Sequence, residues 1–132
     1  MGKKFRANNV KFGFEDLEVW QKAINFADKV IDIGDKLNNT NRKHYRLVEQ
    51  LESSATSIAM NIAEGKGRYS KREFIQFLYI ARGSLYETIT LLMILHKKNW
   101  IDGAQLDELK GSGSEVGRKI SSLINSIGNS MS

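Results

Sequence analysis

The chain has 132 residues, of which 41% are apolar and 27% charged, and a formal net charge of +5 at pH 7. That length suits one domain with a core of its own. Cysteine is absent, which excludes disulfides, thiol nucleophiles and thiolate metal sites. Proline is also absent, which favours long helices joined by short links.

The basic N-terminus has no apolar run behind it, so no signal peptide is expected. The most apolar stretch, 85–95, is interrupted by Glu87 and is too short to span a bilayer. We therefore expect a cytoplasmic protein with no membrane partner. The positive charge favours nucleic acid as a partner; the alternative is that it only keeps the protein soluble.

A basic mobile leader is predicted over 1–13, followed by a first helix over 16–37 with Asp16 as its N-cap. This helix carries two apolar stripes with alternating spacings of three and four. One stripe contains Leu17, Trp20, Ile24, Ala27 and Ile31. The other contains Val19, Ala23, Phe26, Val30, Ile33 and Leu37. A turn follows at 38–41.

A second helix is predicted over 42–64, with Gly65 in the position that commonly ends a helix. Its apolar seam is flanked by small residues, so we expect it to be central. The seam consists of Val48, Leu51, Ala55, Ile58 and Ile62.

The third helix is predicted over 70–96, where Ser70 and Glu73 have the spacing of a capping box. It too has two stripes. The first is Phe74, Leu78, Ala81, Leu85, Thr88, Leu92 and Leu95. The second is Ile75, Tyr79, Arg82, Tyr86, Ile89 and Met93.

The fourth helix is predicted over 102–127, opened by a capping box of Asp102 and Gln105, with a tail over 128–132. The segment 111–114, Gly-Ser-Gly-Ser, resembles a linker, yet the apolar register continues through it. We therefore expect one weakened helix, since two interior glycines cost roughly 2 kcal/mol relative to alanine.

Short links place consecutive helices side by side, so the predicted class is all-α, an antiparallel up-down-up-down four-helix bundle over 14–127. The first and third helices carry more apolar surface than one bundle face needs, which predicts self-association. The alternative is unusually wide burial within one subunit. Candidate interface residues are Phe26, Ile75, Tyr79, Arg82, Tyr86 and Met93. Arg82 is expected to pair with Glu87, Glu49 or a carboxylate of a neighbouring copy.

Cations gather at both ends of such a bundle. Candidate nucleic-acid contacts are Lys66, Arg68, Lys71 and Arg72 at one end, and Arg42, Lys43, Arg46, Lys97 and Lys98 at the other. The alternative for the last two is that they complement a helix dipole. Five residues form a structural corner by this interpretation, with Asn61 and Glu64 bonding free N–H groups and Arg68 pairing with Glu64 or Glu73: Asn61, Glu64, Gly65, Ser70 and Glu73.

The residue patterns predict no enzyme, cofactor or metal. A di-iron bundle needs Glu-x-x-His pairs, but Asn41 and Met93 precede His44 and His96 by three positions. Neither a dinucleotide fingerprint nor a Walker lysine motif is present.

The segments Phe14–Ala23 and Ser57–Arg68 resemble the bacterial four-helix bundle family, the proteins of intervening sequences within large-subunit ribosomal RNA genes. The likeness continues through Ser70, Glu73 and Phe74 and reaches Glu115–Arg118. This resemblance implies a closed ring of bundles, typically five, with no known enzyme activity.

A similar protein is the accessory variability determinant of diversity-generating retroelements, a basic pentameric bundle that binds a reverse transcriptase and its template RNA. The resemblance thus implies RNA, a reverse transcriptase and further copies of the chain as partners. Two hypotheses follow. The first is a non-enzymatic oligomeric scaffold that binds RNA or DNA through basic patches. The second is a purely structural or protein-binding oligomer.

Overall fold

The computed structural model describes residues 9–40 and 44–131. Within these ranges the chain forms four α-helices and one short 3-10 helix, with no strand, which confirms the predicted all-α class. The elements are η1 (Gly13–Asp16), α1 (Glu18–Thr40), α2 (Tyr45–Lys66), α3 (Lys71–Lys97) and α4 (Gly103–Asn129).

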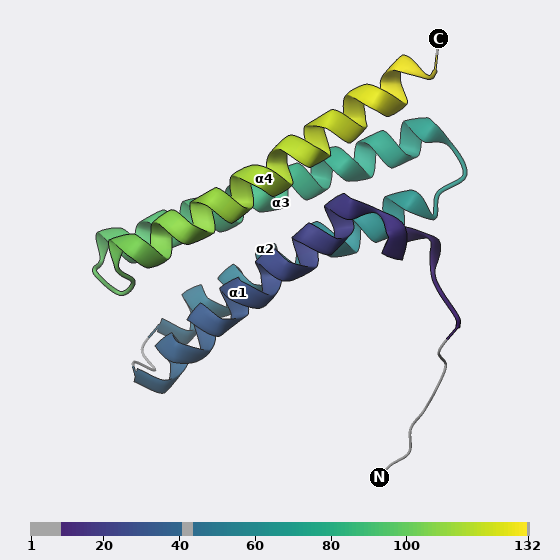
Figure 1. The fold of residues 1–132 in the computed structure, drawn as a ribbon. Helices are drawn as coiled ribbons and strands as arrows, with labels where there is room; N and C mark the ends of the chain where they lie inside the picture. The colour runs from purple at the N-terminus through teal and green to yellow at the C-terminus, as the bar shows by residue number, and fades with distance from the viewer. Residues whose placement is uncertain (1–8, 41–43, 132) are drawn as a thin grey trace.

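The four helices surround one hydrophobic core, and helices that are consecutive in the chain are neighbours around it. In Figure 1 each helix runs back alongside the one before it, and α1 and α4 also lie against each other. In the described part of the chain, the backbones of the diagonal pairs α1–α3 and α2–α4 do not approach each other closely: no two of their Cα atoms lie within 8 Å. The outer surface between α1 and α2, here the α1–α2 face, is therefore opposite the outer surface between α3 and α4, the α3–α4 face.

The start of the bundle differs from the predicted leader and N-cap. Helix α1 begins at Glu18, because Gly13–Asp16 form the 3-10 turn η1 first. The Asp16 carboxylate accepts from Lys11 Nζ at 2.9 Å, and the Phe12 N–H donates to Glu15 Oε2 at 2.8 Å. Residues 9–13 are thus part of an ordered turn, whereas 1–8 lie outside the described residues.

Helix α4 runs unbroken through 111–114, as predicted, and extends to Asn129, beyond the predicted start of the tail. Its capping box is present, with both bonds between Asp102 and Gln105 at 2.8 Å. Gly113 is buried; a Cβ added there would lie 2.9 Å from Ile89 Cδ1 and 3.3 Å from Phe26 Cε1. Gly113 of this linker-like segment therefore lies where α4 packs closely against α1 and α3.

The core contains the predicted seams, but the roles of the two α1 stripes differ from expectation. Phe26 is 0% exposed inside one subunit, so its prediction as an interface residue is wrong. Ile24, on the other stripe, is 41% exposed. The stripes lie roughly 100° apart, and periodicity alone does not say which one faces the core.

Gly65 does not end a helix. Helix α2 continues to Lys66 and is capped by Gly67, while Gly65 is buried. A Cβ added at Gly65 would lie 2.7 Å from Phe77 Cβ and 2.9 Å from Phe74 Cδ1. This glycine therefore lets the first turns of α3 lie directly on the last turn of α2.

A ladder of hydroxyl groups joins α2 to α3. Ser54 Oγ and Thr88 Oγ1 are 2.8 Å apart, and Ser57 Oγ and Ser84 Oγ are 2.9 Å apart. Asn61 Nδ2 donates back to Ser57 at 2.8 and 2.9 Å, so its predicted role at the α2–α3 link is wrong. Small residues on α2 were predicted to let neighbouring helices approach closely. Two of them, Ser54 and Ser57, also form hydrogen bonds to α3.

Helix α3 is long and apolar enough to span a membrane when only length and composition are counted. A core helix of a soluble protein passes the same test. In this bundle Leu78, Leu85 and Leu92 of α3 are 0–2% exposed, so packing accounts for much of its apolar character.

Candidate nucleic-acid interface and docking faces

The link between α2 and α3 carries a group of exposed cations, here the link cluster, which consists of Lys66, Arg68, Lys71 and Arg72. Arg68 Nη2 lies 2.8 Å from Glu64 Oε2, which confirms the predicted pair, and its guanidinium lies 4.8 Å above the Phe77 ring. Arg68 is thereby held in place and partly neutralised.

The other three cations of the link cluster have no acidic partner in the described part of the chain. Among the described residues, no carboxylate forms an ion pair with Lys66, Lys71 or Arg72. Lys71 Nζ donates to Ser130 Oγ at 3.0 Å, which leaves its charge uncompensated. The nearby Glu73 takes part in the cap of α3: its N–H donates to Ser70 Oγ at 3.1 Å, which is one of the two bonds of the predicted capping box, and its Oε1 accepts from Ser70 Oγ at 3.4 Å.

Tyr69 lies in the middle of the link cluster and is fully exposed, at 103%. Sequence analysis did not single it out. The available signal was an aromatic residue set between cations in a link, the arrangement in which a ring can stack on an exposed base.

The opposite end has fewer described candidates. Arg42 and Lys43 lie outside the described residues, while Arg46, Lys97 and Lys98 are exposed. At this end the His44 ring stacks on Trp100, with centroids 3.4 Å apart. Trp100 is therefore engaged in packing within the subunit.

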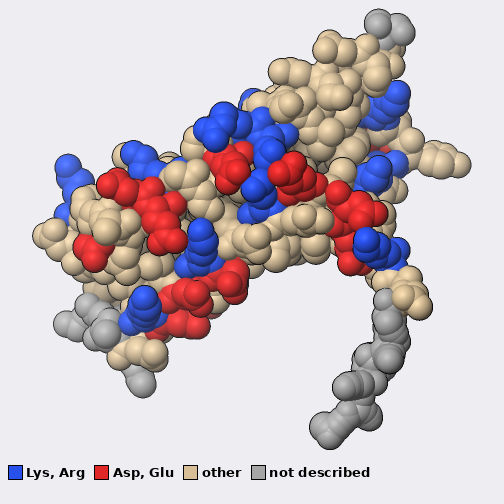
Figure 2. Space-filling view, in the orientation of Figure 1, with Lys and Arg blue, Asp and Glu red and all other residues tan. Residues whose placement is uncertain are grey.

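Positive charge in the middle of the bundle is neutralised along the α1–α4 seam. Lys22 lies 3.0 Å from Glu115, Lys29 3.5 Å from Glu108, and Lys119 3.2 Å from Glu18. Blue and red side chains lie side by side over this seam in Figure 2. The hydrogen bond and charge of Lys22 lower the pKa of Glu115. The cations of the link cluster that lack an ion-pair partner lie away from this seam.

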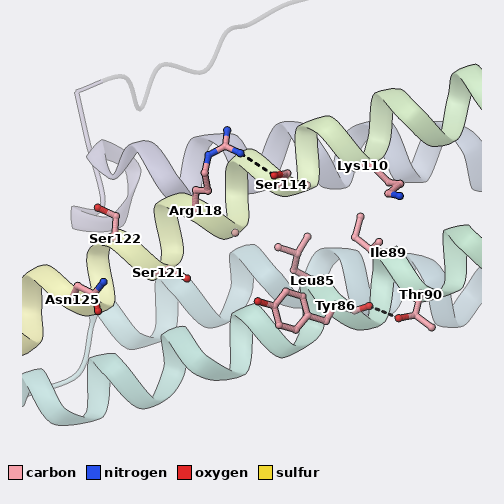
Figure 3. A pocket seen from close by; sticks show the side chains of 12 residues that line it. Leu85, Tyr86, Ile89, Thr90, Lys110, Ser114, Arg118, Ser121, Ser122 and Asn125 are labelled. Carbon is pink, nitrogen blue, oxygen red and sulfur yellow. Dashed lines mark hydrogen bonds between the residues drawn. The ribbon is translucent and has the colours of Figure 1, made fainter.

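A groove of about 910 Å³ opens on the α3–α4 face (Figure 3). Leu85, Tyr86, Ile89 and Thr90 of α3 form one side. The α4 side is built mainly of glycine and serine, and its only charged lining residues are Lys110 and Arg118. The groove therefore joins apolar surface to positive charge.

Three of the predicted interface residues lie on the outside of α3. Tyr79 is 49% exposed, Tyr86 59% and Met93 47%. Ile75 is instead half-buried and packs against the core. These three exposed side chains, here the α3 stripe, are surplus to the core of one subunit.

Arg82 pairs with neither Glu87 nor Glu49, so these two predicted partners are wrong, while a carboxylate of a neighbouring copy stays a prediction. Its Nη1 donates to Ser121 Oγ at 3.0 Å, and its guanidinium lies 4.9 Å above the Tyr79 ring. Helical geometry explains why Glu87 is not the partner, because positions five apart on a helix lie about 140° apart around its axis. Glu87 instead lies on the α2 side, where it accepts from Gln50 at 3.5 Å.

Side chains suited to metal binding are dispersed. No group of three or more His, Cys, Asp or Glu residues that could hold a metal ion occurs in the described ranges. The features that remain are basic ends, an apolar stripe and a groove.

Together these observations define a class, a small four-helix bundle with a neutralised α1–α4 seam and uncompensated cations at its ends. Residues 15–122 match the model of the 23S rRNA-intervening sequence protein family, and the chain belongs to that family. The resemblance found in the sequence is thereby confirmed.

The fold is also similar to a solved protein of unknown function from the S23 ribosomal protein family of Bacteroides thetaiotaomicron VPI-5482. The TM-score is 0.76 at 28% identity, over 80% of this chain and 97% of that one. No curated protein matches the chain.

Proposed function

We propose that this protein is a non-enzymatic cytoplasmic scaffold, an up-down-up-down bundle assembled into a homopentameric ring that binds nucleic acid, RNA above all. The observation that carries the proposal is the division of charge. Lysines of the α1–α4 seam have carboxylate partners, whereas Lys66, Lys71 and Arg72 of the link cluster have none among the described residues.

Assembly multiplies the effect of a small basic patch. One subunit offers a few phosphate contacts at each end, and a ring repeats them in every copy. Each neutralised phosphate releases a counterion, so affinity rises with the number of contacts and falls steeply with salt. Tyr69 adds a stacking surface beside these cations.

A more specific form of the proposal is an accessory subunit that presents template RNA to a reverse transcriptase in a diversity-generating retroelement. Its support is the resemblance to the accessory protein of such elements. In this form the basic ends hold the RNA, and the surfaces not used between copies contact the reverse transcriptase.

Binding to a structured RNA should be measured over a range of salt concentrations. We expect the logarithm of affinity to fall linearly with the logarithm of salt, by about 0.7–0.9 per phosphate contact. Neutralising the link cluster with Lys66→Gln, Lys71→Gln and Arg72→Gln should weaken binding and flatten that slope.

The matched control is Lys29→Gln, which removes a cation already neutralised by Glu108. It should leave the slope unchanged. No binding of the unmodified chain at low salt would refute the nucleic-acid proposal and favour the second candidate, a structural or protein-binding oligomer. The α3 stripe and the groove beside it support that second candidate, because aromatic and Met side chains are enriched at protein contacts.

A further inference from the structure

The two opposite outer faces of the bundle both carry apolar surface. The α1–α2 face has a shallow groove of about 300 Å³, lined almost entirely by apolar atoms of Trp20, Ile24 and Met60 together with neighbouring small residues. Met60 is 66% exposed. The α3–α4 face has the larger groove and the α3 stripe beside it. Aromatic and Met side chains are enriched at protein–protein contacts relative to the rest of a protein's surface.

The α1–α2 face also bears uncompensated negative charge. The Glu52 carboxylate of α2 lies over Gly34 of α1. Its pKa is raised, first by burial and then by the charges of Asp35 and Glu49. Neither Glu49 nor Glu52 forms an ion pair with any described cation.

The α3–α4 groove has the opposite sign. Lys110 and Arg118 line it, and no carboxylate does. Arg118 Nη1 donates to the neutral hydroxyl of Ser114 at 2.9 Å and forms no ion pair with a described carboxylate, although its charge contributes to lowering the pKa of Glu115. An apolar face with acids thus lies directly across the bundle from an apolar face with cations.

These charges also lie at matching levels along the bundle. The contact between His44 and Trp100 places the starts of α2 and α4 at the same end. Glu52 is the eighth residue of α2, which starts at Tyr45, and Lys110 is the eighth of α4, which starts at Gly103. At 1.5 Å per residue both lie about 10 Å from that end.

We propose that the α3–α4 face of one copy receives the α1–α2 face of a second copy, with Lys110 opposite Glu49 and Glu52 and the α3 stripe against Ile24 and Met60. Two different faces meet in this contact, so it is head-to-tail and forms rings or filaments, not two-fold dimers. Because the charges match without a shift along the bundle axis, repeating this contact adds no rise along that axis, as a closed ring requires. This inference rests on the oligomer in the proposed function and assigns its interface.

Charge reversal tests the assignment, with mass measured by size-exclusion chromatography and light scattering. Lys110→Glu alone and Glu52→Lys alone should each place like charges in contact, and each should raise the dissociation constant of the oligomer at least tenfold. The double variant Lys110→Glu with Glu52→Lys should restore assembly, because it exchanges the two charges. A variant that merely misfolds would not be rescued in this way.

Lys98→Glu is the matched control, since it makes the same charge change at the end of the bundle, outside both faces. It should leave the mass unchanged. If the unmodified chain is oligomeric and either single reversal leaves its dissociation constant unchanged, or the double variant is not rescued, the face assignment is wrong while the proposed oligomer stands. If the unmodified chain is a monomer, both are wrong.

Discussion

At the scale of single residues, two glycines of similar appearance in the sequence have opposite structural roles. Gly65 has no room for a side chain, because Phe77 Cβ would lie 2.7 Å from an added Cβ. At Gly111 no atom outside the local helix lies within 4 Å of that position. One glycine therefore permits helix contact, and the other only weakens a helix.

This contrast predicts opposite changes in stability. Gly65→Ala should lower the free energy of unfolding by about 1–3 kcal/mol, the usual cost of overpacking. Gly111→Ala should raise it by up to about 1 kcal/mol through helix propensity. Urea denaturation measures both. A stabilising Gly65→Ala would show that α3 does not lie on α2 as described.

The raised pKa of Glu52 makes a second residue-scale prediction. The folded protein holds this proton more tightly than the unfolded chain, so stability is lost as pH rises through the raised pKa. Glu52→Gln should therefore stabilise the unassembled subunit at pH 7, measured in the Lys110→Glu background that disfavours assembly, by less than about 1 kcal/mol because the site is partly exposed. The gain should vanish below about pH 4, where both states are protonated.

Glu115→Gln is the control of opposite sign. Lys22 lowers the pKa of Glu115, so this carboxylate contributes stability at neutral pH that is lost as pH falls through the lowered pKa. Its replacement should destabilise the protein at pH 7 and have no effect in strong acid. Equal pH profiles for the two variants would contradict the charge arrangement described for the two sites.

At the scale of helices, the hydroxyl ladder between α2 and α3 should show energetic coupling. Thr88 is 0% exposed; its hydroxyl donates to the Ser84 carbonyl at 2.8 Å and lies 2.8 Å from Ser54 Oγ. Thr88→Val should cost about 1–2 kcal/mol, because buried partners lose hydrogen bonds. In a double-mutant cycle with Ser54→Ala the two losses should fall short of additivity. Additive losses would show that the pair does not interact.

The helices themselves could be predicted from sequence because period, capping residues and the absence of proline agreed with one another. Helix α3 differs from prediction by one residue at each end, and α2 ends two residues later than predicted. Helix α1 continues through 38–40, where a turn was predicted, so that prediction is wrong for these residues. The orientation of α1 could not be predicted, since Ile24 and Phe26 belong to stripes of equal apolar character. Only contacts with α2 and α4 decide which stripe is buried.

The candidate site residues show the same distinction: contacts within one helix could be predicted from sequence, and contacts between helices could not. Arg68 with Glu64 is a local i,i+4 pair and was predictable. Arg82 with Ser121 joins two helices, and no sequence period reports which helix supplies a partner. Gly65 is similar, because its role depends on the ring of Phe74 and on Phe77 in the next helix.

At the scale of the whole molecule, charge and apolar surface are divided by position. Carboxylates neutralise lysines along the α1–α4 seam, acids gather on the α1–α2 face, and uncompensated cations lie at the link cluster and in the α3–α4 groove. In a lone subunit the apolar faces stay exposed to solvent and each basic end occurs only once. Copies that meet through opposite faces would bury the apolar surface and repeat the basic ends around an assembly.

The most direct test of this account is the mass of the unmodified chain in solution, measured by light scattering over a range of micromolar concentrations. We predict a single closed species of five subunits, five times the subunit mass of 15.0 kDa, with little dependence on concentration. A stable species of 15.0 kDa throughout that range would contradict the account, because both apolar faces would then remain uncovered.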